Sequence, residues 1–312
     1  MVEFIMFVGL PASGKSTYAK EYENKGYKVL SSDLVREEIS LQLERGELIM
    51  PDNTNLNSMV FDKLAKMAKE SLHLGVPVVL DATNLARKRR KNFLRALYKV
   101  NCKKICLIFV TPVDECYSRN KQRQGNACVP DESMYKMLCS FECPTYFEGF
   151  DEIIPISTGK EYKFDFSLVK DFNQESKYHS LTLDKHMQKA YEYSIEHNFS
   201  ENVIKCAKYH DIGKVYTKRY ENSKGEPSEI PHYYNHENYG AYLYLVEHCS
   251  GKVLSDEELK VILYQTCLIN SHMRPLNLWR WHESVRDKDK RFFGEEFFND
   301  LLNLNKADIM AH

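Results

Sequence analysis

The sequence predicts an α/β domain, with a parallel sheet covered by helices on both faces, followed by an all-helical domain. Two observations predict this division. Short apolar runs alternate with helical patterns up to about residue 157, and from about residue 181 the apolar periodicity is helical almost throughout. A length of 312 residues also favours two domains over one. We therefore expect domains at 1–157 and 181–312, joined by a polar linker at 158–180.

The first half is expected to supply every strand of the sheet. Apolar runs predict strands at 3–8, 27–30, 77–80, 105–110 and 153–156. Amphipathic patterns between them predict helices at 15–24, 33–45, 57–74, 87–99 and 113–122. In the second half the expected helices cover 183–197, 200–211, 236–249, 256–272 and 295–311, with a polar loop at 219–231.

Composition excludes some classes of protein. No apolar run approaches the roughly 20 residues that span a bilayer, and the N-terminus has neither a basic segment nor a small-residue cleavage site, so we expect no membrane segment and no secretion signal. The nine cysteines form no CxxC pair, which favours reduced, buried thiols in a cytoplasmic protein; a cysteine-based metal site or redox switch is the alternative. The net charge of −1 means that any nucleic-acid binding must depend on local patches.

Residues 9–16, Gly-Leu-Pro-Ala-Ser-Gly-Lys-Ser, follow a predicted strand and precede a predicted helix, the context that a phosphate-binding loop requires. Glycines permit the tight backbone, whose N–H groups point at phosphate oxygens. Lys15 is expected to reach the β- and γ-phosphates, and the Ser16 hydroxyl to ligate Mg²⁺. The loop predicts a phosphotransferase that uses ATP or another nucleoside triphosphate. The expected nucleotide contacts are Gly9, Ala12, Ser13, Gly14, Lys15, Ser16 and Thr17.

Two carboxylates follow predicted strands, at the sheet edge where ligands bind in open α/β sheets. Asp33 follows the second strand and is placed to accept the proton of an attacking hydroxyl, while Arg36, one helical turn later, is placed to hold an anionic group of the acceptor. The structural alternative is a helix N-cap at Asp33 beside a solvated Arg36. Asp81 ends the third strand, in the usual form of a second acid near the metal.

Two groups of basic residues lie further along the first half. Asn84 is expected to cap a helix whose first turns carry the five cations 87–91, and these oppose the helix dipole. Bound phosphate or nucleic acid is one explanation, and a solvated basic face is the other. Arg119 and Arg123 lie four residues apart on one predicted helix, where a mobile lid would stabilise charge on the transferred phosphoryl group. The alternative for them is a pair of surface arginines.

In the second half, His210 and Asp211 are adjacent and share a predicted helix face with Lys214, which is placed to hold a phosphate. Asp308 falls on an apolar stripe, where a metal ion would satisfy a carboxylate that is costly to bury alone. These ligands on separate helices suit one or two divalent transition metals, which generate hydroxide near neutral pH. The further histidines of the expected set are His186, His236 and His272, and the competitors for ligand positions are His179, His197, His232 and His248.

The first half resembles the P-loop kinase family that includes the phage polynucleotide 5′-kinases. The matching segments are the loop at 9–17, Ser-Ser-Asp33-Leu-Val-Arg36, Leu-Asp81-Ala-Thr-Asn84, Arg119-Asn-Lys-Gln-Arg123, Phe141-Glu142-Cys-Pro144 and Glu148-Gly-Phe-Asp-Glu-Ile. The resemblance implies that Asp33 is the general base and that Arg36 contacts the acceptor phosphate. It also implies lid roles for Arg123 and Arg119, and a role for Asp81 in organising the metal and the acceptor. Related small-molecule kinases share the loop and the lid.

The second half resembles the HD superfamily of metal-dependent phosphohydrolases, through His210-Asp211-Ile-Gly-Lys214 and the histidines and aspartate around it. The resemblance implies a core metal site formed by His186, His210, Asp211 and Asp308. His236 and His272 match members that hold two metals and cleave phosphomonoesters or phosphodiesters. The metal expected in this site is Mn²⁺, Ni²⁺, Fe²⁺, Co²⁺ or Zn²⁺.

Together the two resemblances imply a bifunctional enzyme that heals broken RNA or DNA ends. It would phosphorylate 5′-hydroxyl ends and remove 2′,3′-cyclic phosphate or 3′-phosphate ends, and a nucleic-acid ligase is a candidate partner. Two alternatives stay open: a small-molecule kinase with an attached nucleotide phosphohydrolase, and a kinase regulated by a non-catalytic nucleotide-sensing module. RNA or DNA preference, the nucleotide donor and the oligomeric state, a homodimer included, are left open by the sequence.

Overall fold

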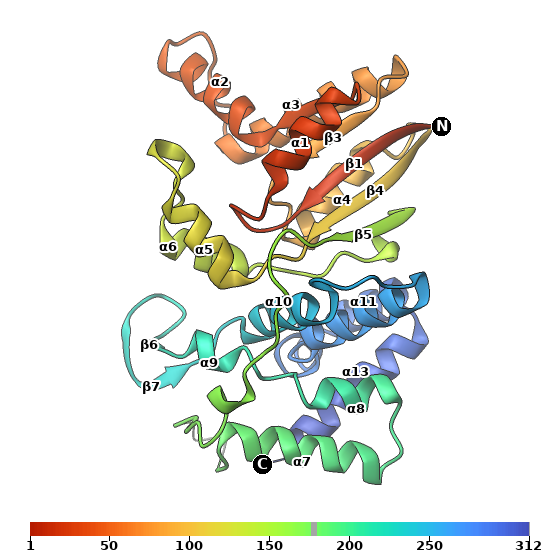
Figure 1. Ribbon diagram of the computed structural model, residues 1–312. Coiled ribbons are helices and arrows are strands. Elements are labelled where there is room, and N and C mark those ends of the chain that lie inside the picture. Colours follow the sequence, from red (N-terminus) through yellow and green to blue (C-terminus); the bar gives the residue numbers. More distant parts are fainter. Residues whose placement is uncertain (176–179, 312) are drawn as a thin grey trace. The chain divides into compact units, whose positions relative to one another are not determined.

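The computed structural model of the chain describes residues 1–175 and 180–311. The chain forms two compact units (Figure 1). The first comprises residues 1–130 and 144–159, and the second comprises residues 131–143 and the chain from residue 160 onward. The observed fold class is the predicted one, an α/β domain with a parallel sheet followed by a helical region.

The first unit is built on a five-stranded parallel sheet with the strand order β2-β3-β1-β4-β5. The central strand β1 pairs with β3 and β4, so that Ile5 lies between Val79 and Ile105. Both faces of β1 are buried from Phe4 to Val8, which explains the continuous apolar sequence of these five residues. The strands are β1 (Val2–Val8), β2 (Lys28–Ser31), β3 (Val78–Asp81), β4 (Cys102–Phe109) and β5 (Glu152–Ile156).

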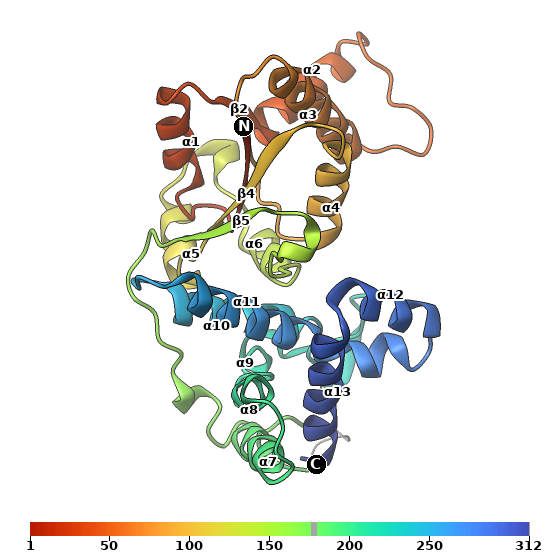
Figure 2. The ribbon, with the colours of Figure 1, turned by 90° about the vertical axis from the view of Figure 1, so that its right-hand side faces the viewer.

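Helices cover both faces of this sheet. On one face, Ala19 of α1 packs on Ile5 and Phe7. On the opposite face, the ring of Phe93 in α4 stacks on Phe4 with 5.5 Å between centroids, and α3 lies beside α4 (Figure 2). The helices of this unit are α1 (Lys15–Asn24), α2 (Ser32–Glu44), α3 (Leu56–His73), α4 (Arg87–Ala96) and α5 (Val113–Lys121).

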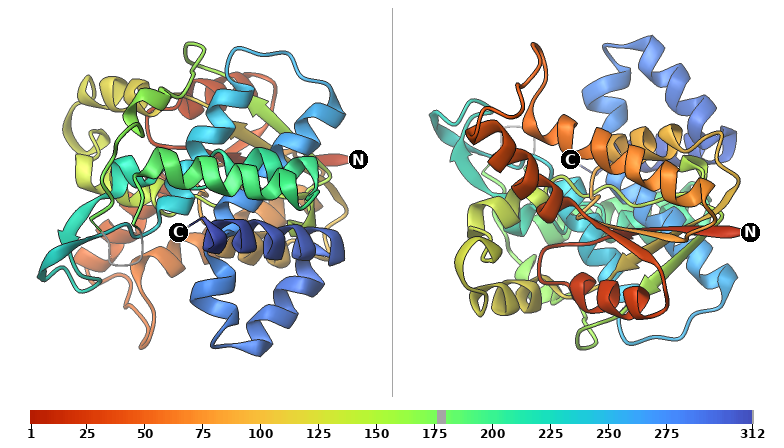
Figure 3. Two further views of the ribbon diagram at one scale, coloured as in Figure 1. Left: turned by 90° about the horizontal axis from the view of Figure 1, so that it is seen from below. Right: turned by 90° about the horizontal axis from the view of Figure 1, so that it is seen from above.

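The second unit is mainly helical. Helices α10 and α11 pack against each other, and α13 packs against both α7 and α8; α7 and α13 lie side by side in Figure 3. The core includes Tyr242, Leu245, Leu268 and Leu301, which are fully buried. The α-helices are α6 (Asp131–Leu138), α7 (Leu183–Glu196), α8 (Glu201–Ala207), α9 (Lys214–Thr217), α10 (His236–Cys249), α11 (Asp256–Ser271), α12 (Glu283–Phe293) and α13 (Glu295–Met310).

Local structure departs from the sequence expectation at several places. Helix α8 ends at Ala207, so that His210 and Asp211 lie in turns before α9 and not within one helix. The expected loop at 219–231 is a hairpin of β6 (Arg219–Glu221) and β7 (Pro227–His232). Gly225 adopts a φ of 81° in its turn, and the Asn222 carboxamide accepts hydrogen bonds from two turn N–H groups. Helices α6 and α12 were not expected.

The division between the units also differs from the expected boundaries. Residues 131–143 pack in the second unit, where the Asn270 side chain bonds the backbone of Phe141 and Cys143 at 3.0 and 2.7 Å. Residues 160–175 belong to the same unit, with Phe164 buried and the N–H of Tyr162 bonded to the Ser250 hydroxyl at 2.9 Å. The segment expected to be a linker therefore contributes buried side chains.

Two expectations from composition can be compared with the structure. All nine cysteines are free, and eight of them are buried, as expected for reduced core thiols. Among the described residues, no helix is both long enough and apolar enough to cross a bilayer.

Candidate functional site

The loop from Gly9 to Ser16 joins β1 to α1. Gly14 has a φ of 95°, in the left-handed region that favours glycine, and a Cβ on Gly9 would lie 2.8 Å from the Cβ of Phe109. The ammonium of Lys15 is buried and donates hydrogen bonds to the carbonyl oxygens of Gly9 at 3.0 Å and Leu10 at 2.5 Å. Burial lowers the pKa of Lys15 to about 8, against the opposing effect of Asp81. The loop thus holds the Lys15 ammonium in a buried position, where the negative charge of a bound phosphate would balance it.

A cavity of about 580 Å³ opens beside this loop within the first unit. Arg119 of α5 reaches it, donates hydrogen bonds to the Thr158 carbonyl at 2.5 Å and hydroxyl at 3.2 Å, and pairs with Glu115 at 2.6 Å. The Thr158 hydroxyl in turn donates to the Ser13 carbonyl at 2.7 Å. The structure therefore connects Arg119 to the phosphate-binding loop. The cavity lining comprises Ala12, Gly14, Ser16, Thr17, Tyr18, Arg119, Arg123, Ser157 and Thr158.

The carboxyl ends of the parallel strands bring Asp33 and Asp81 to the same edge of the sheet. Ser31 pairs with Asp81 in the β2–β3 register and caps α2 by accepting a hydrogen bond from Leu34, so Asp33 is not the N-cap. The Asp33 side chain is 91% exposed and pairs with Arg36 at 3.0 Å. Burial raises the pKa of Asp81, Lys15 opposes this rise, and Asp33 adds to it. The acceptor candidates thus lie within electrostatic reach of the phosphate-binding lysine.

The basic run at 87–91 divides into structural and exposed members. Arg90 is fully buried and forms a bidentate ion pair with Glu148 at 2.8 and 2.7 Å, while also donating to the carbonyls of Asn84 and Leu85. Arg87 lies 4.0 Å from Glu148 as well. This buried acid explains why cations are tolerated at the start of α4. The capping expectation for Asn84 is wrong, because its amide donates to Phe7 at 2.8 Å and α4 begins after Ala86 without a side-chain cap.

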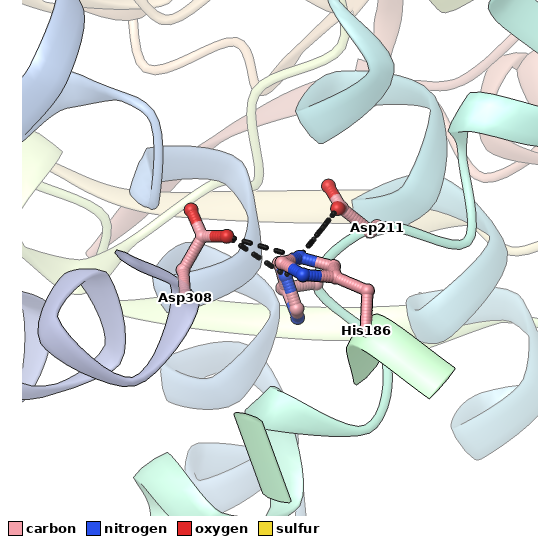
Figure 4. Close-up of side chains that lie close together, drawn as sticks. His186, Asp211 and Asp308 are labelled. Atoms are coloured by element: carbon pink, nitrogen blue, oxygen red, sulfur yellow. Dashed lines mark hydrogen bonds and ion pairs between the residues drawn. The ribbon is translucent and has the colours of Figure 1, made fainter. Parts of the chain in front are cut away.

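In the second unit, four side chains from three segments of the chain converge on one point. The Nε2 atom of His186 lies 3.3 Å from the Asp211 carboxylate and 3.1 Å from the Asp308 carboxylate, and Figure 4 shows the His186 ring between these two acids. The Nε2 of His210 lies 3.4 and 3.6 Å from the same two carboxylates. All four residues are buried, and together they could hold a metal ion.

A second group shares Asp211 with the first. One carboxylate oxygen of Asp211 faces His186 and His210, and the other lies 3.0 Å from the Nε2 of His236 and 3.6 Å from that of His272. These three residues could hold a second ion, and they too are buried. Asp211 is thus placed as a carboxylate common to two adjacent metal positions.

The histidine rings are oriented in a way that fits metal ligands. The Nδ1 atoms of His210, His236 and His272 face backbone carbonyl oxygens at 2.9, 2.8 and 2.8 Å, and that of His186 faces the Ala311 carbonyl at 3.4 Å. A carbonyl oxygen only accepts hydrogen bonds, so Nδ1 is the nitrogen that donates to it, and Nε2 is the nitrogen that faces the carboxylates. Pairs of Nε2 atoms approach to 3.3 and 3.2 Å, close enough for both nitrogens of a pair to contact one cation. The donor set therefore fits divalent metals that accept nitrogen and oxygen.

Lys214 opens α9 and lies against the same cluster. Its ammonium pairs with Asp211 at 2.6 Å and donates a hydrogen bond to the Gln174 carboxamide at 2.9 Å. Burial opposes ionisation of both Asp211 and His210, but Lys214 and His210 outweigh it and hold the pKa of Asp211 well below its usual range. The carboxylates Asp211 and Asp308 likewise raise the pKa of His210 to about 10, against the effect of burial. The cluster therefore favours positive charge at its centre.

The competing histidines lie elsewhere. His197 directly follows α7, is exposed and stacks on Tyr193 with 3.8 Å between ring centroids. His232 is the last residue of β7 and stacks on Tyr234. His248 stacks on Tyr244, and burial lowers its pKa to about 4. His179 lies outside the described residues.

Sequence reasoning missed Thr158 and Gln174, which position Arg119 and Lys214 respectively. Each is an isolated polar residue outside any recognisable motif, so the local sequence contained no signal for it.

Comparisons with known proteins give matches over about half of the chain. Residues 4–144 match the family model described as an AAA domain. The matched range is less than half of the chain. The chain is 25% identical over 171 residues to L-seryl-tRNA(Sec) kinase of Methanococcus maripaludis, a match that covers 53% of this chain and 62% of that protein. It is 28% identical over 160 residues to human heterogeneous nuclear ribonucleoprotein U-like protein 2, over 48% of this chain and 21% of that protein.

The match therefore spans less than two thirds of either relative. Among solved structures, a chain of the Pnkp1/Rnl/Hen1 RNA repair complex aligns with 44% of this chain and 42% of its own length, at 20% identity and a TM-score of 0.36.

Proposed function

We propose that the chain is a bifunctional nucleic-acid end-healing enzyme. The first unit would transfer the γ-phosphoryl group of ATP to a 5′-hydroxyl end, and the second would hydrolyse a 2′,3′-cyclic phosphate or 3′-phosphate end. The observation that carries the proposal is that each unit contains its own group of side chains suited to act on a phosphate. In the first unit Asp33 and Arg36 lie at the sheet edge beside the loop of Lys15, and in the second six metal-ligand side chains converge.

In the kinase step, each residue of the first unit has a defined task. Asp33 would take the proton of the 5′-hydroxyl, whose oxygen forms a bond to the γ-phosphorus while the bond from that phosphorus to the β–γ bridging oxygen breaks, releasing ADP. Arg36, ion-paired to Asp33 at 3.0 Å, would hold the phosphate on the 3′ side of the acceptor nucleoside. Its pairing with Asp33 also orients that carboxylate.

The remaining groups would act on the phosphoryl donor. The Lys15 ammonium would exchange the loop carbonyls that it bonds at present for the β- and γ-phosphate oxygens. Arg119 and Arg123 line the same cavity and would stabilise negative charge on the transferred group. Ser16 would ligate Mg²⁺ and Asp81 would orient it, and the bound ion would supply charge neutralisation between the β- and γ-phosphates.

In the second unit, His186, His210, Asp211 and Asp308 would hold one divalent ion, and Asp211, His236 and His272 a second. Bound ions would supply Lewis acidity at a phosphoryl group and would lower the pKa of water. The buried Nδ1–carbonyl contacts keep the four rings in place, and Lys214 would exchange Gln174 for a phosphate oxygen of the substrate. The two products, a 5′-phosphate and a 3′-hydroxyl, are the ends that a nucleic-acid ligase joins.

One relative supports phosphoryl transfer to an RNA-linked substrate, because it is named as a kinase of an L-seryl-tRNA. The proposal is tested with a labelled RNA oligonucleotide that carries a 5′-hydroxyl and a 2′,3′-cyclic phosphate, and with a DNA oligonucleotide that carries a 5′-hydroxyl and a 3′-phosphate, each incubated with ATP, Mg²⁺ and Mn²⁺. Wild-type protein is expected to change both ends. Lys15→Ala should abolish 5′-phosphorylation alone, and Asp211→Ala should abolish removal of the 3′-terminal phosphate alone.

The alternatives give different results in the same assay. A nucleoside phosphorylated as well as the oligonucleotide would indicate a small-molecule kinase. A second unit that binds nucleotides and no metal, and leaves the 3′ end intact, would indicate a sensing module. Wild-type protein with neither activity on the oligonucleotide contradicts the proposal.

A further inference from the structure

A second cavity of the first unit, of about 500 Å³, is lined by residues of α3 and α4. It is distinct from the cavity beside the phosphate-binding loop, with which it shares no lining residue. Its polar and aromatic walls comprise Asn55, Asn57 and Phe61 on one side and Lys88, Arg89 and Asn92 on the other. The neighbouring Arg90 has its partner in Glu148, whereas Arg89 and Lys88 face this cavity.

The cavity combines an aromatic ring with a cation that lacks an acidic partner. The Arg89 guanidinium lies over the Phe61 ring, 4.6 Å from its centroid. Within residues 1–175 and 180–311, no carboxylate lies at ion-pair distance from Arg89; Asp62 is the one acid of the lining. Burial and the nearby Arg36 both lower the pKa of Arg89. Two guanidinium groups that repel each other beside a polar cavity favour an anionic ligand.

The cavity continues directly from the acceptor residues. Arg36 pairs with Asp33 at 3.0 Å and donates a second hydrogen bond to the Asn57 carboxamide at 2.9 Å. Asn57 is itself part of the cavity wall. Asp33, Arg36, Asn57 and the Phe61–Arg89 pair therefore form a continuous series across α2, α3 and α4.

We infer that this cavity is a second acceptor subsite, which binds the nucleotide that follows the 5′-terminal nucleoside of the strand. The base stacks on the Arg89 guanidinium, which the Phe61 ring supports from its other side; proteins hold single-stranded nucleic acid by such stacking with little dependence on sequence. The amides of Asn55 and Asn92 bond the sugar and the base edge. The inference rests on the proposed kinase function. It implies that the preferred phosphate acceptor is a nucleic-acid strand and not a mononucleotide.

The test compares two acceptors, a nucleoside 3′-phosphate and a dinucleotide with a 5′-hydroxyl and a 3′-phosphate. For wild-type protein the dinucleotide should have the lower KM. Arg89→Gln and Phe61→Leu should each raise the dinucleotide KM about tenfold, the value of one base stack, with a much smaller change for the nucleoside 3′-phosphate. Lys69→Gln, on the exposed face of α3 and outside the cavity, is the matched control and should behave as wild type.

Folding of each variant is checked by its affinity for ATP, which binds at the other cavity. Equal KM values for the two acceptors in wild-type protein, or variants that affect both acceptors alike, overturn the second subsite and leave the kinase proposal standing. If wild-type protein phosphorylates neither acceptor, the proposed kinase function fails first.

Discussion

The most discriminating prediction concerns Asp211, which alone belongs to both metal-ligand groups of the second unit. Asp308→Asn removes a ligand from the first group only, and His236→Gln removes a ligand from the second group only. Asp211→Asn removes one from each. We therefore expect wild-type protein to bind two divalent ions, Asp308→Asn and His236→Gln to bind one each, and Asp211→Asn to bind neither tightly.

The size of the effect on stability follows from linkage. An ion at a hundredfold excess over its Kd stabilises the folded state by about 2.7 kcal/mol. For a domain of this size each kcal/mol shifts Tm by about 2–4 °C, so each occupied position should add roughly 5–10 °C. Wild-type protein should then show about twice the metal-induced shift of either single-site variant, and Asp211→Asn almost none.

The assay is elemental analysis of protein dialysed against Mn²⁺, combined with thermal unfolding in Mn²⁺ and in chelator. His197→Gln is the matched control, because His197 directly follows the helix that carries His186 but is exposed and stacks on Tyr193. Tm in chelator reports any damage by the substitutions themselves. If Asp308→Asn and Asp211→Asn lose the same number of ions, or wild-type protein binds none, the two-position reading of the cluster is refuted.

Three further predictions concern other parts of the chain. Arg90→Met should lower the free energy of unfolding of the first unit by about 3–5 kcal/mol, because it leaves the Glu148 carboxylate buried without its bidentate partner; urea unfolding measures this, and a loss below about 1 kcal/mol contradicts a structural role. The folded pKa of His248 is about 4 because of burial, so stability contributed by the neutral ring is present above pH 6.5 and is lost as the pH falls towards 4. Wild-type protein should lose roughly 2 kcal/mol more than His248→Phe over this interval, allowing for partial exposure of the ring, and parallel pH profiles of unfolding would show that the ring titrates normally. Asp33→Asn should lower kcat for 5′-phosphorylation by about 10²–10⁴-fold, the value of a general base, while Arg36→Gln should mainly raise the acceptor KM; steady-state kinetics that show the reverse pattern would reassign the two residues.

Several features were predictable because they depend on neighbours in the sequence. The loop around Gly14 and Lys15 needs a glycine backbone between a strand and a helix, and both requirements are visible locally. The strands of the parallel sheet were predictable for the same reason, since a buried parallel strand such as β1 is apolar continuously from Phe4 to Val8. The ends of helices were less predictable: α8 stops at Ala207, and His210 and Asp211, which follow it, contact His186 and Lys214 from other segments.

The candidate site in the second unit shows where local sequence stops being sufficient. The sequence by itself determined that His210 and Asp211 are adjacent, and that His186 and Asp308 lie on apolar helix faces where polar side chains need a partner. Only the tertiary structure decided which oxygen of Asp211 faces which histidines, because that depends on the packing of α7, α10, α11 and α13.

The basic run at 87–91 shows the same difference between what local sequence specifies and what tertiary contacts decide. The sequence by itself determined that cations crowd the start of a helix, where they need a compensating group. Only the tertiary structure decided that Arg90 is compensated by the distant Glu148, while Arg89 lies over Phe61 beside an open cavity. The physical reason is that burial and pairing are properties of contacts between distant segments, and no local pattern specifies the partner.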